Sequence, residues 1–259
     1  MRRFLLAVFL GLGGVSALAE DNYFIGLGRN GQGWIEVRWG AGRSHAPWGW
    51  ARLPWSEYNA AGGESRVATG DVDGDGNDEL LVGLSAFPAG GGGFVGVFDD
   101  CGKGCRFLRW VRVPWAAYNS RNGETTPACG DLDGDGDDEV VVGLGRTALG
   151  WAYVCDLNGL RGWVRLPAGT PGDGASRPAC GDVDGDGRDE IVLGTGRGGG
   201  ARVAVLDDAA ASYAFLRWLP TPQDGYARLV GESRPACGDV DGDGDAEILV
   251  GRGPYPAYG

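Results

Sequence analysis

The sequence has a single histidine, His45, and none of its cysteines form a Cys-x-x-Cys pair. A zinc cluster of histidines and cysteines is therefore disfavoured. It also lacks a serine nucleophile elbow and a cysteine nucleophile accompanied by histidine, so the common triads have no candidates. We therefore expect a protein that is not an enzyme. A carboxylate pair of glycosidase type among the remaining acidic residues is the minor alternative.

Long apolar runs are also absent after the first residues. No later segment approaches the roughly 20 apolar residues that a membrane span needs. The chain begins with two arginines, continues with an apolar stretch and reaches the small-residue sequence Ala17-Leu18-Ala19. This pattern is typical of a secretory signal peptide cleaved after Ala19. We expect residues 1–19 to be the signal and residues 20–259 to form one secreted domain.

Export would place all six cysteines in an oxidising compartment. Cys101 and Cys105 are close enough in sequence to form a local disulfide, whereas the pairing of the other four is left open. The formal charge of −12 disfavours binding to nucleic acid or to an anionic membrane.

The acidity is concentrated in a repeat that occurs four times. Matching segments of 17 residues begin at Ala68, Ala128, Ala179 and Ala236, for example ACGDLDGDGDDEVVVGL, and they recur every 51 to 60 residues. This period is typical of propeller blades rather than of short solenoid repeats.

Each copy holds a nine-residue loop with carboxylates at positions one, three, five and nine and glycines at positions four and six. Alternate residues of a tightly curled loop direct their oxygens inward, and the glycines permit the curling. A cage of six to eight oxygens suits calcium, so we expect about four calcium ions per chain. The predicted ligands, with the position-seven main-chain carbonyl named fourth in each loop, are Asp71, Asp73, Asp75, Asn77 and Glu79; Asp131, Asp133, Asp135, Asp137 and Glu139; Asp182, Asp184, Asp186, Arg188 and Glu190; and Asp239, Asp241, Asp243, Asp245 and Glu247.

An EF-hand loop also begins Asp-x-Asp-x-Asp-Gly, but it needs a glutamate at position twelve and a helix on each side. Position twelve is apolar in all four copies, namely Val82, Val142, Leu193 and Val250. The loop leads into a β-branched run such as EVVVGLG, which predicts a short buried strand. The EF-hand interpretation is therefore excluded.

These segments resemble the FG-GAP and VCBS repeats, which include those of the integrin α-subunit propeller. The resemblance is specific over each 17-residue copy and, with the downstream strands, extends over nearly all of residues 20–259. It implies an all-β β-propeller of four-stranded blades, with calcium bound between the first and second strands of a blade. It also implies a role in recognition.

Counting strands leaves the number of blades open. Four blades are the simplest closure, with the C-terminal strands sharing a blade with the N-terminal ones, and five blades with incomplete ends are the alternative. Residues 22–28 (NYFIGLG) repeat the second-strand pattern without a preceding loop. This surplus strand offers a route to self-association, because an unpaired strand edge can pair with another chain.

Two repeats carry an aromatic patch in the connection that leads to the inner strand. The residues are Trp55, Tyr58 and Asn59 in one copy and Trp115, Tyr118 and Asn119 in the other. Such a patch could stack on a sugar ring and bind its hydroxyls, or it could pack between blades. We therefore expect a secreted, calcium-binding recognition or adhesion module for an extracellular glycan or protein. A structural subunit that assembles through its surplus strand is the alternative.

Overall fold

The computed structural model describes residues 15–17, 23–38, 46–87, 91–99, 101, 104–219, 221–222 and 224–254. His45 lies outside this set. The chain divides into two compact units, Met1–Cys129 and Gly130–Gly259. In the part of the chain that the structure describes, no helix has the length and apolarity needed to cross a membrane.

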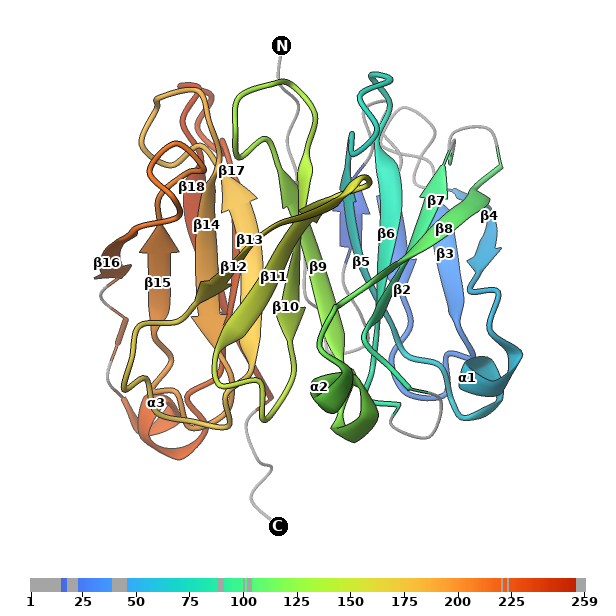
Figure 1. Cartoon of the computed structure of the whole chain (residues 1–259), viewed down its shortest axis with the longest axis horizontal. Helices are drawn as coiled ribbons and strands as arrows, with labels where there is room; N and C mark the ends of the chain where they lie inside the picture. Colours follow the sequence, from blue (N-terminus) through green and yellow to red (C-terminus); the bar gives the residue numbers. More distant parts are fainter. Residues whose placement is uncertain are drawn as a thin grey trace. The chain divides into compact units, whose positions relative to one another are not determined.

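The described residues form four four-stranded sheets and one two-stranded sheet (Figure 1). Within each sheet the strands follow one another in chain order, and neighbours are antiparallel. The sheets comprise β1 (Val15–Ala17), β2 (Tyr23–Gly26), β3 (Trp34–Arg38) and β4 (Pro47–Arg52); β5 (Ser65–Gly70), β6 (Glu79–Leu84), β7 (Phe94–Asp99) and β8 (Arg106–Arg112); β9 (Thr125–Gly130), β10 (Glu139–Leu144), β11 (Trp151–Asp156) and β12 (Gly159–Arg165); β13 (Ser176–Gly181), β14 (Glu190–Thr195), β15 (Val203–Leu206) and β16 (Phe215–Leu219); and β17 (Ser233–Gly238) with β18 (Glu247–Arg252).

Four-stranded antiparallel meanders of this kind are the blades of a β-propeller, and the predicted all-β propeller fold is confirmed. The first sheet differs from expectation in its inner strand. That place is taken by β1, which lies within the residues predicted to be the export signal, and not by the C-terminal strands. As a result β2, the predicted surplus strand, is paired on both sides, with β1 and with β3.

The second strands of the complete repeats form the core. Every residue of β6, β10 and β14 is buried. Their valines, leucines and isoleucines suit a strand that is covered on both faces. The acidic loops lie between the first and second strands of their sheets, as predicted. Burial of the second strand anchors one end of the first three loops, whereas β18, which follows the fourth loop, is mostly exposed.

A recurring contact joins each second strand to the next inner strand in the same unit. A Cβ placed on Gly194 of β14 would lie 2.4 Å from the Ser233 carbonyl oxygen, so only glycine fits there. The next residue, Thr195, donates its main-chain N–H to Ser233 Oγ at 2.8 Å. The same hydrogen bond recurs from Leu144 to Ser176, at 3.0 Å. Packing between these adjacent sheets thus depends on a glycine in the second strand and on the hydrogen bond that the next residue donates to a serine of the inner strand.

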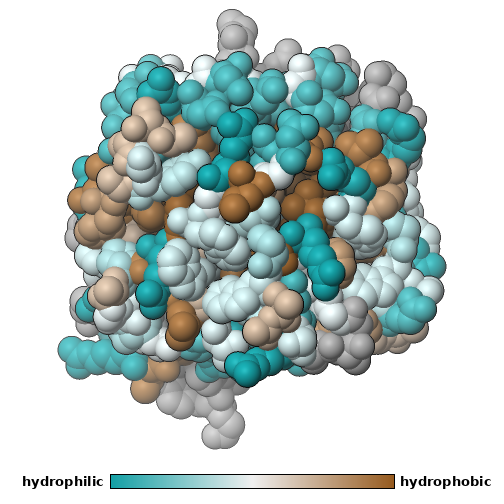
Figure 2. All heavy atoms as spheres, in the orientation of Figure 1, coloured by the Kyte–Doolittle hydropathy of each residue, from teal (hydrophilic) through white to brown (hydrophobic). Residues whose placement is uncertain are grey.

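In the described part of the chain, three short helices that the sequence did not predict precede inner strands. They are α1 (Ser56–Ala60), α2 (Ala116–Arg121) and α3 (Gly225–Leu229). Because each helix leads into the start of an inner strand and each acidic loop follows its end, helices and loops lie at opposite ends of the sheets (Figure 1). On the face drawn in Figure 2, hydrophilic side chains cover much of the surface, with hydrophobic side chains scattered among them.

Cys101 and Cys105 form a disulfide, as the sequence indicated. The remaining cysteines are buried and are not disulfide-bonded; they are Cys129, Cys155, Cys180 and Cys237.

Candidate metal centre

The acidic loops are curled by their own first aspartate. Asp71 Oδ1 accepts the main-chain N–H of Gly74 at 2.9 Å, and its Oδ2 accepts that of Gly76 at 2.9 Å. Both glycines have positive φ, at 74° and 86°, a conformation that other residues rarely adopt. The same two bonds recur at Asp131, Asp182 and Asp239. The spacing of aspartates and glycines therefore dictates the loop shape.

This curl gathers the carboxylates of positions one, three and nine. In all four loops one oxygen from each of these residues lies within 4.8 Å of the others. The clusters are Asp71, Asp73 and Glu79; Asp131, Asp133 and Glu139; Asp182, Asp184 and Glu190; and Asp239, Asp241 and Glu247. The structure thus brings together three of the four predicted side-chain ligands of every loop.

The aspartate at position five is engaged differently. Asp75 Oδ1 accepts the main-chain N–H of Asn77 at 2.9 Å. The equivalent bonds recur in the other loops, from Asp137 to Asp135, from Arg188 to Asp186 and from Asp245 to Asp243. Binding of an ion by the fifth carboxylates and by the seventh main-chain carbonyls stays a prediction.

The clusters carry unbalanced negative charge. Burial, and after it the neighbouring Asp73, raises the pKa of Glu79 to about 8. Burial and Asp133 raise the pKa of Glu139 to about 7. The pKa of Glu190 is raised to about 7 by burial, partly offset by the hydrogen bond from Val183 N–H. A raised pKa means that the ionised form of the carboxyl group is disfavoured, and a bound cation would offset that cost.

Two buried oxygens test whether a cation fits. Oε1 of Glu79 and Oε1 of Glu190 have no hydrogen-bond partner, although both side chains are fully buried. A buried carboxylate oxygen without a hydrogen-bond partner costs free energy unless an ion or another group binds it. Because each of these glutamates belongs to a cluster made only of carboxylates, the donor set fits a hard divalent cation such as calcium.

Sequence reasoning missed three contributors to these loops. Asp78, at position eight, is held near the cluster, and burial together with Asp71 raises its pKa to about 6. Arg161 reaches the second loop from β12, and Arg188 of the third loop pairs with Asp208 at 3.2 Å. Arg161 and Asp208 gave no local signal, because they reach these loops from distant positions in the sequence, and Asp78 lies inside its loop at a position that the ligand spacing does not use.

The predicted aromatic patches lie mainly inside the fold. The side chains of Tyr58, Asn59, Tyr118 and Asn119 are buried, and Asn59 Nδ2 donates to the Leu53 carbonyl at 2.8 Å. In this arrangement all four support the helices and are not presented to a ligand. Trp55 and Trp115 are half-buried, so the predicted sugar-stacking role now depends on these two side chains.

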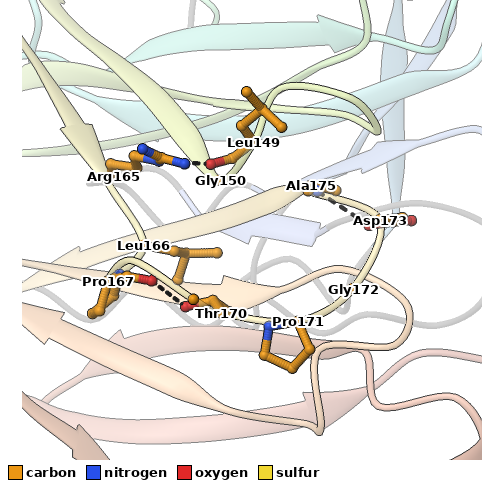
Figure 3. A pocket seen from close by; sticks show the side chains of 12 residues that line it. Leu149, Gly150, Arg165, Leu166, Pro167, Thr170, Pro171, Gly172, Asp173 and Ala175 are labelled. Atoms are coloured by element: carbon orange, nitrogen blue, oxygen red, sulfur yellow. Dashed lines mark hydrogen bonds between the residues drawn. The ribbon is translucent and has the colours of Figure 1, made fainter.

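A small hollow of about 140 Å³ lies in the connection from β12 to β13, which has no helix (Figure 3). It is lined mainly by glycines, prolines and Leu166. Its polar groups are already engaged, since Arg165 Nε donates to the Leu149 carbonyl and Thr170 Oγ1 to the Pro167 carbonyl. A larger hollow of about 430 Å³ adjoins the second acidic loop.

Comparison with known proteins supports the repeat and the fold. Residues 131–193 match the FG-GAP-like repeat, which confirms the predicted resemblance over the second and third loops. No curated protein matches the sequence significantly.

Among solved structures, a protein from Lactobacillus plantarum is similar with a TM-score of 0.52 and 14% identity, over 92% of this chain and 65% of that one. The exotype rhamnogalacturonan lyase YesX is similar with a TM-score of 0.47 and 20% identity, over 95% of this chain and 55% of that one. The Dos1 propeller is similar with a TM-score of 0.44 and 10% identity, over 91% of this chain and 67% of that one. The chain thus spans about half to two thirds of the length of these proteins.

Proposed function

We propose that the protein is an exported, calcium-binding β-propeller module that recognises an extracellular glycan or protein. The observation that carries the calcium assignment is the cluster of three carboxylate oxygens within 4.8 Å in every acidic loop. The partnerless buried oxygens of Glu79 and Glu190 support it. Export is supported by the N-terminal sequence pattern and by the Cys101–Cys105 disulfide.

In the first loop Asp71, Asp73 and Glu79 would hold the ion, and their equivalents would do so in the other three. Bound calcium would supply the positive charge that these carboxylates lack. Because the aspartates follow the inner strand and the glutamate begins the second strand, holding one ion fixes the two strands to each other. Calcium would therefore stabilise the scaffold that presents the recognition surface.

The test is the number of calcium ions bound and the melting temperature with and without chelator. We expect close to four ions per chain. A site filled at about 100 times its Kd contributes about 2.7 kcal/mol of stability, so chelation should lower the melting temperature markedly. The variant Glu79→Gln should bind one ion fewer, whereas the exposed Glu57→Gln should bind as wild type does. Absence of bound calcium together with an unchanged melting temperature would refute the proposal.

Ligand recognition is tested on a glycan array and by capture of defined extracellular proteins, both in calcium and in chelator. Glycans that bind on the array are then incubated with the protein, and the mixtures are examined for new reducing ends or unsaturated products. Binding without product formation supports a recognition module. Product formation would instead support the minor alternative of a carbohydrate-active enzyme.

Self-assembly is the second candidate function, and β18 favours it. Among the described residues β18 pairs only with β17. Leu249 and Val250 are each 39% exposed, whereas the matching strands β6, β10 and β14 are buried throughout. An edge strand with exposed apolar side chains is a template for pairing with another chain.

Sedimentation velocity over a range of concentrations tests this role. The double variant Leu249→Lys and Val250→Lys should remove concentration-dependent assembly, since charged edge strands resist pairing. Leu229→Lys, at a 65% exposed position on α3, is the control and should leave assembly unchanged. A wild-type protein that sediments as a monomer at all concentrations would exclude self-assembly.

A further inference from the structure

The second acidic loop holds an arginine side chain. Arg161, on β12, places Nε 2.9 Å from Asp156 Oδ2, Nη1 3.4 Å from Asp133 Oδ2 and Nη2 3.6 Å from Glu139 Oε1. Asp133 and Glu139 belong to the second carboxylate cluster. The two outer nitrogens of the guanidinium therefore take part of the place that a cation would occupy.

Among the residues that the structure describes, no arginine forms an ion pair with the carboxylate cluster of the first or the third loop. There the matching glutamate oxygens, Glu79 Oε1 and Glu190 Oε1, have no hydrogen-bond partner. Arg161 stands two residues before Trp163, and the residues two before Trp110 of β8 and Trp218 of β16 are leucines, Leu108 and Leu216. The arginine is thus a feature of this one repeat and is not required by the outer strand itself.

Arg161 also lies on the wall of the hollow of about 430 Å³. Trp163 of β12 and Tyr213 of the turn before β16 line the same hollow, together with Ser212, Asp133 and Glu139. The Tyr213 ring is positioned over Gly162, where an added Cβ would lie 3.4 Å from its Cε2. Gly162 therefore leaves the space in which this ring forms part of the wall.

The turn that carries Tyr213 is held against the second loop in an unusual conformation. The main-chain N–H of Ala209 donates to the Leu132 carbonyl at 3.0 Å. Ser212 and Tyr213 both have positive φ, at 57° and 56°. Neither is glycine, and adjacent residues in this region are strained, a cost that folded proteins often retain at binding sites.

We propose that this hollow, which we call the Arg161 pocket, binds a saccharide bearing a carboxylate, and that it does so when the second loop holds calcium. The proposal rests on the calcium-binding function proposed above. When Asp133 and Glu139 bind the ion, Nη1 and Nη2 of Arg161 lose these two ion-pair partners, while Nε remains paired with Asp156. The two freed nitrogens form the fork that binds a carboxylate in a bidentate manner.

Asp156 would hold the Arg161 side chain in place while its other two nitrogens change partners. Its Oδ1 accepts the main-chain N–H groups of Asn158 and Gly159, each at 2.6 Å. Although burial acts in the opposite direction, these bonds and Arg161 hold the pKa of Asp156 below its usual value. Asp156 therefore stays charged and fixes one side of the guanidinium while the other side changes partner.

The aromatic walls favour a saccharide over an acidic peptide. Trp163 and Tyr213 are half-buried and leave part of each ring available to the hollow. Aromatic faces pack against the apolar faces of sugar rings, and the hydroxyl of Ser212 adds a hydrogen-bonding group. An acidic peptide has the carboxylate but generally no rigid ring to fill this space.

The first measurement compares calcium binding by the whole protein and by Arg161→Leu, using titration calorimetry. Removing a competing cation should tighten one site about tenfold, the order expected when two partly exposed ion pairs no longer compete. Arg217→Leu is the matched control, since it removes the same charge from an exposed position on the neighbouring strand β16. Equal calcium affinities in Arg161→Leu and Arg217→Leu would overturn the competitor role.

The second measurement is binding of a glucuronate-containing disaccharide, its methyl ester and a short glutamate-rich peptide, each in calcium and in chelator. We expect wild type and Arg217→Leu to bind the acidic disaccharide only in calcium and to bind the ester at least tenfold more weakly. Arg161→Leu should lose this binding while keeping its calcium.

Three results would overturn the proposal. Undiminished disaccharide binding by Arg161→Leu would remove the arginine from the site, and equal binding of the peptide would remove the saccharide assignment. No disaccharide binding by a protein that holds calcium in all four loops would refute the pocket alone. Failure to bind any calcium would refute the proposed function itself, and the two failures are thereby distinguished.

Discussion

The main-chain N–H of Asp189 donates to the carbonyl oxygen of Asp131 at 2.9 Å. This bond joins position eight of the third loop to position one of the second. Position eight of the fourth loop repeats it, because Ala246 N–H donates to the Asp182 carbonyl at 2.6 Å. The second, third and fourth acidic loops are thus linked through residues next to their carboxylate clusters.

We expect calcium binding to these three loops to be positively cooperative, because ordering one loop fixes a partner of the next. The variant Asp182→Ala should remove the third site and also weaken its neighbours, each several-fold. Competition titration against a chromophoric chelator measures both effects. Loss of a single ion with the remaining affinities unchanged would show that the loops bind independently.

Without calcium, stability should depend on pH in an unusual direction. The pKa of Glu79 is raised from 4.5 to about 8, and those of Glu139 and Glu190 to about 7. A carboxyl group with a raised pKa binds its proton more tightly in the folded chain. Its contribution is fully present below about pH 4.5 and is lost as the pH rises through 7 to 8.

Melting curves in chelator between pH 5 and 9 measure this dependence. The melting temperature should fall across the range and should fall less in Glu79→Gln, whose side chain is neutral throughout. Saturating calcium should abolish the fall, because the ionised form is then the bound form. A flat profile in chelator would contradict the assigned burial of charge.

The hydroxyl of Tyr58 should contribute to stability rather than to ligand binding. It donates to the Glu64 carbonyl at 2.5 Å and accepts the Ser85 main-chain N–H at 2.8 Å. Tyr58→Phe leaves both groups unsatisfied and should cost about 1–3 kcal/mol. Denaturant unfolding measures the loss, and glycan binding should be unchanged. A stable variant with weakened glycan binding would instead place Tyr58 in a binding surface.

The close approach at Gly194 should make an added methyl group damaging. In Gly194→Ala the new Cβ meets main-chain atoms of Ser233, which cannot move without displacing β17. We expect a loss of about 1–3 kcal/mol, typical of overpacking. Gly49→Ala is the control, since nothing lies within 4 Å of its Cβ and its φ is not positive. Equal stability of the two variants would contradict the packing described here.

The repeating features were predictable because they are encoded locally. The spacing of Asp71, Asp73 and Glu79 is enough to define a curled oxygen cage, and the β-branched run after it is enough to define a buried strand. Four copies reinforce each inference, so the fold and the carboxylate clusters follow from the sequence.

What escaped prediction is either too short or too distant in the chain. The helix Ser56–Ala60 spans little more than one turn and shows no 3.6-residue period. The strand Val15–Ala17 belongs to an apolar run that also fits an export signal. Arg161 meets Glu139 from 22 positions away, through pairing of outer strands that no local pattern specifies.

The presence of Arg161 where sibling strands have leucine has a consequence for how the protein responds to its surroundings. Duplicated loops with one common design would all fill over the same narrow range of calcium concentration. An arginine in a single copy separates that copy from the rest. The other loops can then stay filled and keep the fold intact, while the altered one follows local conditions. Repetition thereby allows one molecule to contain both a constant framework and a concentration sensor.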